Sequence, residues 1–137
     1  MLCRNFLAYA EGMINIGIEG RDKLGCEITS EFKMPNYQYD CTNNTEPQCY
    51  TNGNNNMFND VCTHERTQKA GKYTFYSFKD VLRTHNLTKK HIILKTDIEG
   101  GEFPTLRYLP LEDLDYIDQI LGELHFFGEP NAFWGNL

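Results

Sequence analysis

The 137-residue chain lacks three features that would place it in a common functional class. It has no apolar run near the ~20 residues that a membrane-spanning helix needs. It has no basic run, and its net charge of −6 disfavours binding to nucleic acid or to a membrane surface. Its first ten residues are too short and mixed for a signal peptide. The length and a hydrophobic content of 40% predict one domain, residues 1–137, with its own core.

The cysteines also lack a metal-binding spacing. None of the five forms a Cys-x-x-Cys pair, so the sequence predicts no zinc site. Cys41, Cys49 and Cys62 flank a polar stretch, which leaves room for one disulfide without saying which two cysteines form it. The cysteines do not decide whether the protein belongs to the cytoplasm or to the lumen of the secretory pathway.

Asparagine is concentrated in residues 42–56, which contain six of them together with Pro47 and Gly53. This composition predicts a loop. Two tripeptides, 43–45 and 86–88, fit the sequon for N-linked glycosylation, although such tripeptides are common by chance.

Short apolar or aromatic runs alternate with helical patterns along the chain. The expected strands are residues 13–18, 36–40, 57–62, 72–76, 91–96 and 116–126. The expected helices are residues 22–32 and 77–84, with shorter helical turns at 1–11, 102–108 and 111–114. Residues 63–72 are polar and are expected to form a loop. This alternation predicts an α/β fold with a mostly parallel sheet and helices on both faces.

Two glycines mark the turn after the first expected strand. Gly17 and Gly20 let backbone N–H groups and a helix N-terminus face a polar ligand. Asp40 stands twenty residues beyond Gly20, at the end of the second expected strand. An acidic residue at that offset in a nucleotide-binding sheet accepts hydrogen bonds from ribose hydroxyls. The alternative is an ordinary turn and a solvated aspartate.

An acidic segment follows the strand that ends near residue 96. Asp97, Glu99 and Glu102 provide three carboxylates, which can serve as a general base, hold a metal ion or orient substrate hydroxyls. Alternatively, Glu99 and Glu102 favour the start of the following helix through their negative charge. We expect a functional role for Asp97 and the helix role for Glu102.

The last expected strand carries Glu123 and His125 near its end. Strand alternation places both side chains on one face of the sheet. A histidine there can act as a base near neutral pH, or it can be a structural hydrogen-bonding group.

These segments resemble the FkbM-type methyltransferases and related methyltransferase-like proteins. The two matching segments are Leu94-Lys95-Thr96-Asp97-Ile98-Glu99-Gly100-Gly101-Glu102 and Ile120-Leu121-Gly122-Glu123-Leu124-His125-Phe126. It follows the family pattern Lys-x-Asp-x-Glu-Gly-x-Glu and then Glu-Leu-His. Looser similarity places Gly17-Ile18-Glu19-Gly20 at the family's first glycine turn and Tyr39-Asp40-Cys41-Thr42 at its second strand end.

The resemblance implies an S-adenosylmethionine-dependent methyltransferase with a Rossmann-like sheet of seven strands. It places Gly17, Glu19 and Gly20 beside the methionine part of the cofactor, and Asp97 near the transferred methyl group. It places Asp40 at the cofactor ribose, with Cys41 beside it. The last two strands of the family fold have no counterpart in the sequence, so we expect a partial domain, or an oligomer or partner that completes the sheet.

The implied reaction is O-methyl transfer to a small molecule or to a sugar hydroxyl of a glycan, with Asp97 or His125 as the base. One alternative is a non-catalytic module, derived from a truncated methyltransferase, that binds the cofactor or a partner. Another is a transferase that uses Asp97 and Glu99 to hold a divalent cation.

Overall fold

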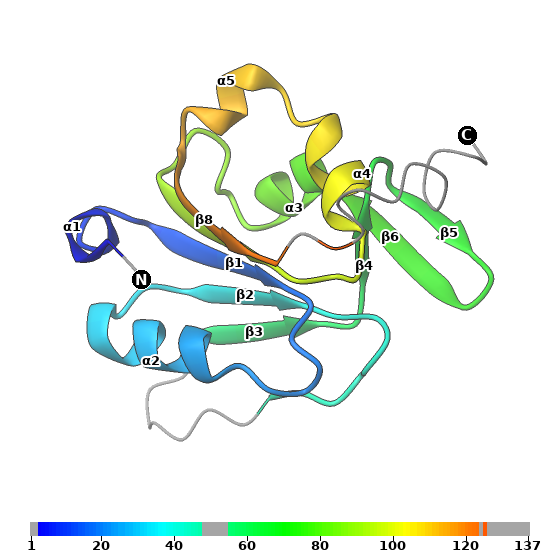
Figure 1. The fold of residues 1–137 in the computed structure, drawn as a ribbon, viewed down its shortest axis with the longest axis horizontal. Helices are drawn as coiled ribbons and strands as arrows, with labels where there is room; N and C mark the ends of the chain where they lie inside the picture. The colour runs from blue at the N-terminus through cyan, green and yellow to red at the C-terminus, as the bar shows by residue number, and fades with distance from the viewer. Residues whose placement is uncertain (1–2, 48–54, 124, 126–137) are drawn as a thin grey trace.

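A computed structural model describes residues 3–47, 55–123 and 125 of the chain. Its main element is a sheet of five parallel strands in the order β3-β2-β1-β7-β8 (Figure 1). The strands are β1 (Gly12–Ile16), β2 (Asn36–Tyr39), β3 (Asn56–Asn59), β7 (Ile92–Thr96) and β8 (Ile117–Gly122). The predicted α/β class with a mostly parallel sheet is therefore confirmed.

Helices lie on both faces of this sheet. They are α1 (Arg4–Leu7), α2 (Lys23–Phe32), α3 (Phe78–Thr84), α4 (Glu102–Arg107) and α5 (Leu111–Leu114). Successive residues of β1 point to opposite faces, as strand geometry requires. Met13 packs with Ile28 of α2 in one apolar cluster, whereas Ile14 packs with Phe78 of α3 in the other. The central strands β1 and β7 are thus mostly buried, with an apolar cluster on each face of the sheet.

A small second sheet lies near the carboxyl ends of the main strands (Figure 1). It has the order β4-β6-β5 and consists of β4 (Cys62–His64), β5 (Gln68–Ala70) and β6 (Tyr73–Ser77). The prediction of a loop over residues 63–72 is therefore wrong in part, because β5 and the end of β4 lie in this range. The single strand predicted at 57–62 is divided between β3 and β4. All three residues of β5 are exposed, so this strand has no alternating apolar pattern that a sequence could reveal.

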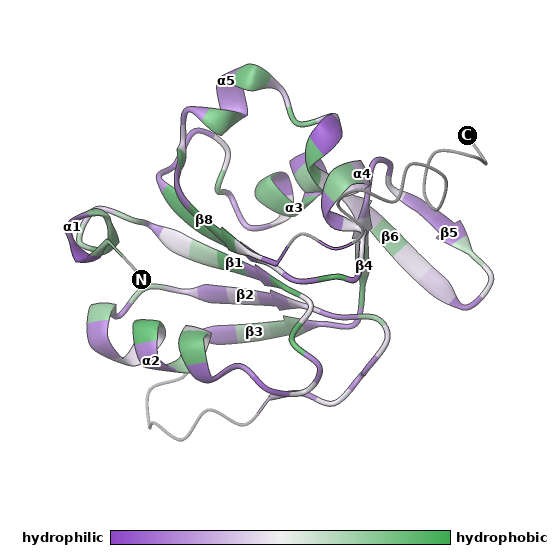
Figure 2. Cartoon of the chain, in the orientation of Figure 1, coloured by the Kyte–Doolittle hydropathy of each residue, from purple (hydrophilic) through white to green (hydrophobic). Residues whose placement is uncertain are grey.

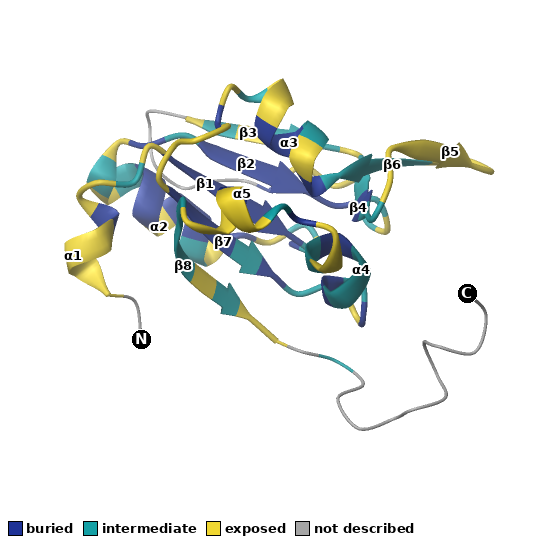
Figure 3. Cartoon of the chain, turned by 90° about the horizontal axis from the view of Figure 1, so that it is seen from above, coloured by how far each residue is buried: buried dark blue, intermediate teal, exposed yellow. Residues whose placement is uncertain are grey.

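The second strand of the main sheet is hydrophilic in sequence and yet buried. Figure 2 colours β2 mainly as hydrophilic, and Figure 3 shows the same strand as buried. Asn36 and Gln38 donate side-chain hydrogen bonds to the carboxylate of Asp22, the N-cap residue of α2. Tyr37 and Tyr39 pack on the opposite face against the α3 side of the core. A polar network and an apolar core thus lie on the two sides of one strand.

The last strand of the sheet is shorter than expected. Residues 116–126 were predicted as a strand, but β8 ends at Gly122, and residues 124 and 126–137 lie outside the described part of the chain. The predicted loop over 42–56 ends where β3 begins, and its residues 48–54 are likewise outside the description. Among the described residues, no helix has the length and apolar character needed to cross a bilayer.

A disulfide joins the two sheets. Cys41, which follows β2, is bonded to Cys62, the first residue of β4. Cys26 of α2 also belongs to a disulfide, which the sequence did not suggest, whereas Cys3 has an exposed free thiol. Cys49, the third cysteine of the predicted set, lies outside the described residues.

Candidate functional site

Three neighbouring strands of the main sheet end at the same level. Their last residues pair in register and are Ile16, Tyr39 and Thr96. The next residue of each strand is Gly17, Asp40 or Asp97, so all three lie at the carboxyl edge. The strand order reverses between β1 and β7. After β1 the chain adds β2 and β3 on one side of it, and it later adds β7 and β8 on the other side. Open α/β sheets bind ligands at this switch point.

A pocket of about 240 Å³ opens at this edge. Five of the six residues predicted to contact a cofactor line it, and these are Gly17, Glu19, Asp40, Cys41 and Asp97. Gly20 does not, because it lines a second hollow of about 860 Å³ beside α2. The pocket therefore brings together the predicted glycine turn and the ends of β2 and β7.

The opposite wall of the pocket comes from the small sheet and from the residue that precedes β4. It includes Val61, His64 and Phe75, none of which the sequence analysis assigned to a site. His64 could not be identified from the sequence, because a single histidine in an expected loop carries no signal of a site. Contact between these residues and the sheet edge depends on the Cys41–Cys62 disulfide and the packing of two sheets.

Asp40 holds two loops together at the pocket wall. One carboxylate oxygen accepts hydrogen bonds from the backbone N–H groups of Ile18 and Glu19, at 3.1 and 2.7 Å. The other accepts from the N–H and hydroxyl of Thr42 and the N–H of Asn43, at 2.8–3.0 Å. Burial acts to raise the pKa of Asp40, but these hydrogen bonds outweigh it and hold the pKa below its usual value. The Asp40 carboxylate is therefore ionised at neutral pH and already well supplied with donors.

Lys95 lies beneath the same edge and was also missed as a site residue. Its ammonium group donates a hydrogen bond to the carbonyl of Gly17 and lies 3.8 Å from a carboxylate oxygen of Asp97. Burial lowers the pKa of Lys95, while nearby carboxylates, with Asp97 first, oppose that effect. The side chain thus ties the glycine turn to the end of β7, a role that the two-residue spacing from Asp97 alone did not reveal.

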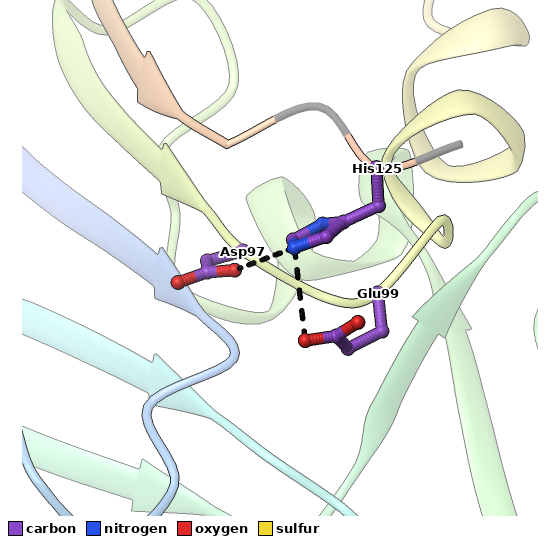
Figure 4. A group of neighbouring side chains, drawn as sticks. All are labelled: Asp97, Glu99 and His125. Atoms are coloured by element: carbon purple, nitrogen blue, oxygen red, sulfur yellow. Dashed lines mark ion pairs between the residues drawn. The ribbon is translucent and has the colours of Figure 1, made fainter. Parts of the chain in front are cut away.

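His125 lies beside the carboxylates of Asp97 and Glu99, which belong to the turn after β7 (Figure 4). Its Nδ1 bonds to Oε1 of Glu102 at 3.1 Å, and its Nε2 lies 3.7 Å from Asp97 and 3.6 Å from Glu99. Glu123, predicted to share its face, lies 3.9 Å from the same nitrogen. The two predicted catalytic residues, Asp97 and His125, are therefore close enough to interact.

Glu102 anchors this cluster from below. Its side chain is 0% exposed, and it accepts hydrogen bonds from the backbone N–H groups of Ile98 and Gly100 as well as from His125. Burial acts to raise the pKa of Glu102, but the hydrogen bonds lower it below its usual value. Glu102 therefore fixes the Asp97–Gly101 turn, which is more than the helix-start role expected of it.

The charge on His125 provides a prediction. Its hydrogen bond to Glu102 raises the pKa of the imidazole above the usual value near 6.5, burial opposes this, and the nearby carboxylates add to it. The stabilising effect of the protonated form is therefore present below about pH 6.5 and is lost as pH rises through the higher folded pKa. We expect an NMR titration of the His125 ring protons to have its midpoint above 6.5.

Replacing one acidic partner at a time shows which carboxylate raises the pKa of His125. Glu102→Gln is expected to lower the His125 midpoint more than Glu123→Gln does, because Glu123 is exposed and more distant. A midpoint at or below 6.5 in the unaltered chain, or equal shifts in the two variants, would contradict this account.

The same cluster offers oxygen and nitrogen atoms to a cation. One ligand atom from each of Asp97, Glu99 and His125 lies within 4.8 Å of the others. Carboxylate and imidazole ligands suit several divalent metals. An ion would have to displace the proton of His125, whose pKa is raised.

Comparisons with known proteins add no assignment to this geometry. No protein-family model, curated protein or solved structure matches the chain.

Proposed function

We propose that the chain binds S-adenosylmethionine at the carboxyl edge and transfers its methyl group to an oxygen of a small molecule or a sugar. The observation that carries the proposal is that Asp40 and Asp97 line one pocket at the point where the strand order reverses. A nucleoside cofactor needs one apolar wall for its base and polar groups for its sugar and charged end. Phe75 and Val61 provide the first, and the acidic strand ends provide the second.

The individual residues suggest how the cofactor would be held. Gly17 allows close approach of the backbone at the end of β1, with Glu19 exposed beside it. Because the oxygens of Asp40 already accept several hydrogen bonds, its part in binding is to shape the loop, and Glu19 is the freer acceptor for ribose hydroxyls. Glu19 has a φ of +49°, a strained conformation of the kind found at binding sites.

When bound, S-adenosylmethionine supplies a methyl group that is already activated by its sulfonium charge. The protein then has to align an acceptor oxygen and remove its proton. Asp97 suits this role, since its side chain is partly exposed at the pocket and is 40% accessible. His125 is less suitable as a base because the hydrogen bond to Glu102 raises its pKa and so favours its protonated form. Its Nε2 lies 3.7 Å from Asp97, where it can help to orient that carboxylate.

Isothermal titration calorimetry with S-adenosylmethionine and S-adenosylhomocysteine tests the proposal. We expect both to bind, and we expect Asp97→Asn to lower the methyl-transfer rate by about 10²–10⁴-fold, the usual range for loss of a general base. Glu112 is exposed in α5 and does not line the pocket, so Glu112→Gln is the control and should leave the rate unchanged. Absence of binding by either compound would overturn the proposal.

Two further outcomes distinguish the alternatives. Cofactor binding without transfer to any acceptor would favour the non-catalytic module. Loss of transfer on chelation of divalent cations would favour the metal-dependent transferase, which the proximity of Asp97, Glu99 and His125 supports.

A further inference from the structure

The disulfides indicate where the chain folds. Cys41 is bonded to Cys62, and Cys26 belongs to another disulfide. Such bonds persist in oxidising environments and are rare in the reducing cytosol. A chain that folds in the secretory pathway also meets the enzymes that glycosylate asparagine, so the two sequons acquire significance.

The second sequon has the geometry of a modified site. Asn86 and Thr88 are exposed, whereas Leu87 between them is 3% exposed and packs into the core beside α3. Asn86 has a φ of +55° and donates its backbone N–H to the carbonyl of Arg83, so the turn holds its shape through the backbone. Among the described residues, its side chain has no hydrogen-bond partner. The amide of Asn86 therefore projects into solvent from a fixed turn.

The first sequon has a different environment. The side-chain oxygen of Asn43 accepts a hydrogen bond from the N–H of Thr45, and its own N–H donates to Asp40. Its amide nitrogen packs closely on Gly20, since a Cβ built on that glycine would lie 3.2 Å away. The atom that would carry a glycan is thus partly enclosed.

The two sequons also lie at opposite edges of the sheet. Asn86 lies between α3 and β7, which places it at the amino edge, away from the pocket. Asn43 follows β2 at the carboxyl edge, next to Thr42, which lines the pocket. A glycan on Asn86 leaves the pocket open, whereas one on Asn43 would stand at its rim.

We propose that Asn86 carries an N-linked glycan and that the chain folds in an oxidising secretory compartment. In the modification, the side-chain nitrogen of Asn86 forms a bond to the anomeric carbon of a lipid-diphosphate-linked oligosaccharide. The bond from that carbon to the diphosphate breaks, the lipid diphosphate leaves and the amide loses one proton. No oxidant or reductant is needed for this transfer.

The test uses the full chain, both as isolated from the cells that make it and as expressed behind a cleavable secretion leader. Peptide mass spectrometry should find Asn86 glycosylated in the isolated protein. In the expressed protein, removal of N-glycans should shift the mobility of the unaltered chain and of Asn43→Gln. It should not shift Asn86→Gln or Thr88→Ala. Because Thr88→Ala keeps the asparagine in its turn, it separates loss of the sequon from misfolding.

Three results would overturn the inference. They are an unmodified Asn86 in the protein isolated from its own cells, a glycan on Asn43 alone, and free thiols at Cys41 and Cys62 in protein isolated without reductant.

Discussion

Gly17→Ala is expected to destabilise the fold by about 2–5 kcal/mol, the sum of an overpacked contact and a left-handed backbone. Gly17 has a φ of +75°, and a Cβ there would lie 1.8 Å from the carbonyl oxygen of Asp97. The same atom would lie 2.7 Å from a side-chain carbon of Ile98. To relieve these contacts, the ends of β1 and β7 must separate, and that separation disrupts the pocket. Chemical denaturation measures the loss of stability, and calorimetry measures the accompanying loss of ligand binding.

Gly71→Ala is the matched control. Gly71 also has a positive φ, of +59°, but a Cβ there would have nothing within 4 Å. Gly71 lies in the turn between β5 and β6. We expect Gly71→Ala to lower the free energy of unfolding by only about 1–2 kcal/mol, the cost of a left-handed backbone at a residue with a side chain. Equal losses of stability in the two variants would show that the close approach of Gly17 to Asp97 does not hold in solution.

The carboxyl edge could be predicted from the sequence because strand ends are visible in it. A short apolar run precedes Gly17 and Asp97, an alternating aromatic run precedes Asp40, and parallel strands place such ends on one edge. The small sheet could not be predicted in the same way. Its strand β5 is exposed throughout and is defined by pairing with β6, which is a tertiary property.

The chemistry of the site was less accessible to sequence reasoning. The spacing from Gly20 to Asp40 suggested an acceptor for ribose, yet the Asp40 carboxylate already accepts backbone hydrogen bonds from both adjoining loops. The protonation of His125 depends on Glu102, which is 23 residues away in the chain. A pattern of residue types locates carboxylates, but their hydrogen-bond partners and charge states depend on the folded environment.

Asp22→Ala is expected to cost about 3–6 kcal/mol, because it leaves several buried donors without an acceptor, each worth about 1–3 kcal/mol. Asp22 is 7% exposed and caps α2 by accepting the N–H of Gly25. The side-chain amides that also donate to it are those of Asn15, Asn36 and Gln38, at 2.5–2.7 Å. All three amides belong to the hydrophilic but buried face of β1 and β2 and are at most 1% exposed. The carboxylate therefore makes a polar sheet face compatible with burial under a helix.

Ser77→Ala tests whether this cost comes from burial or from capping alone. Ser77 caps α3 by accepting the N–H of Asp80 at 3.2 Å, and it lies nearer the surface. Its loss should cost only about 1 kcal/mol, the usual value for an N-cap. Denaturant unfolding of both variants gives the comparison, and failure of Asp22→Ala to fold agrees with the larger cost. If Asp22→Ala is no less stable than Ser77→Ala, the amides of β1 and β2 have other partners, and Asp22 is only a helix cap.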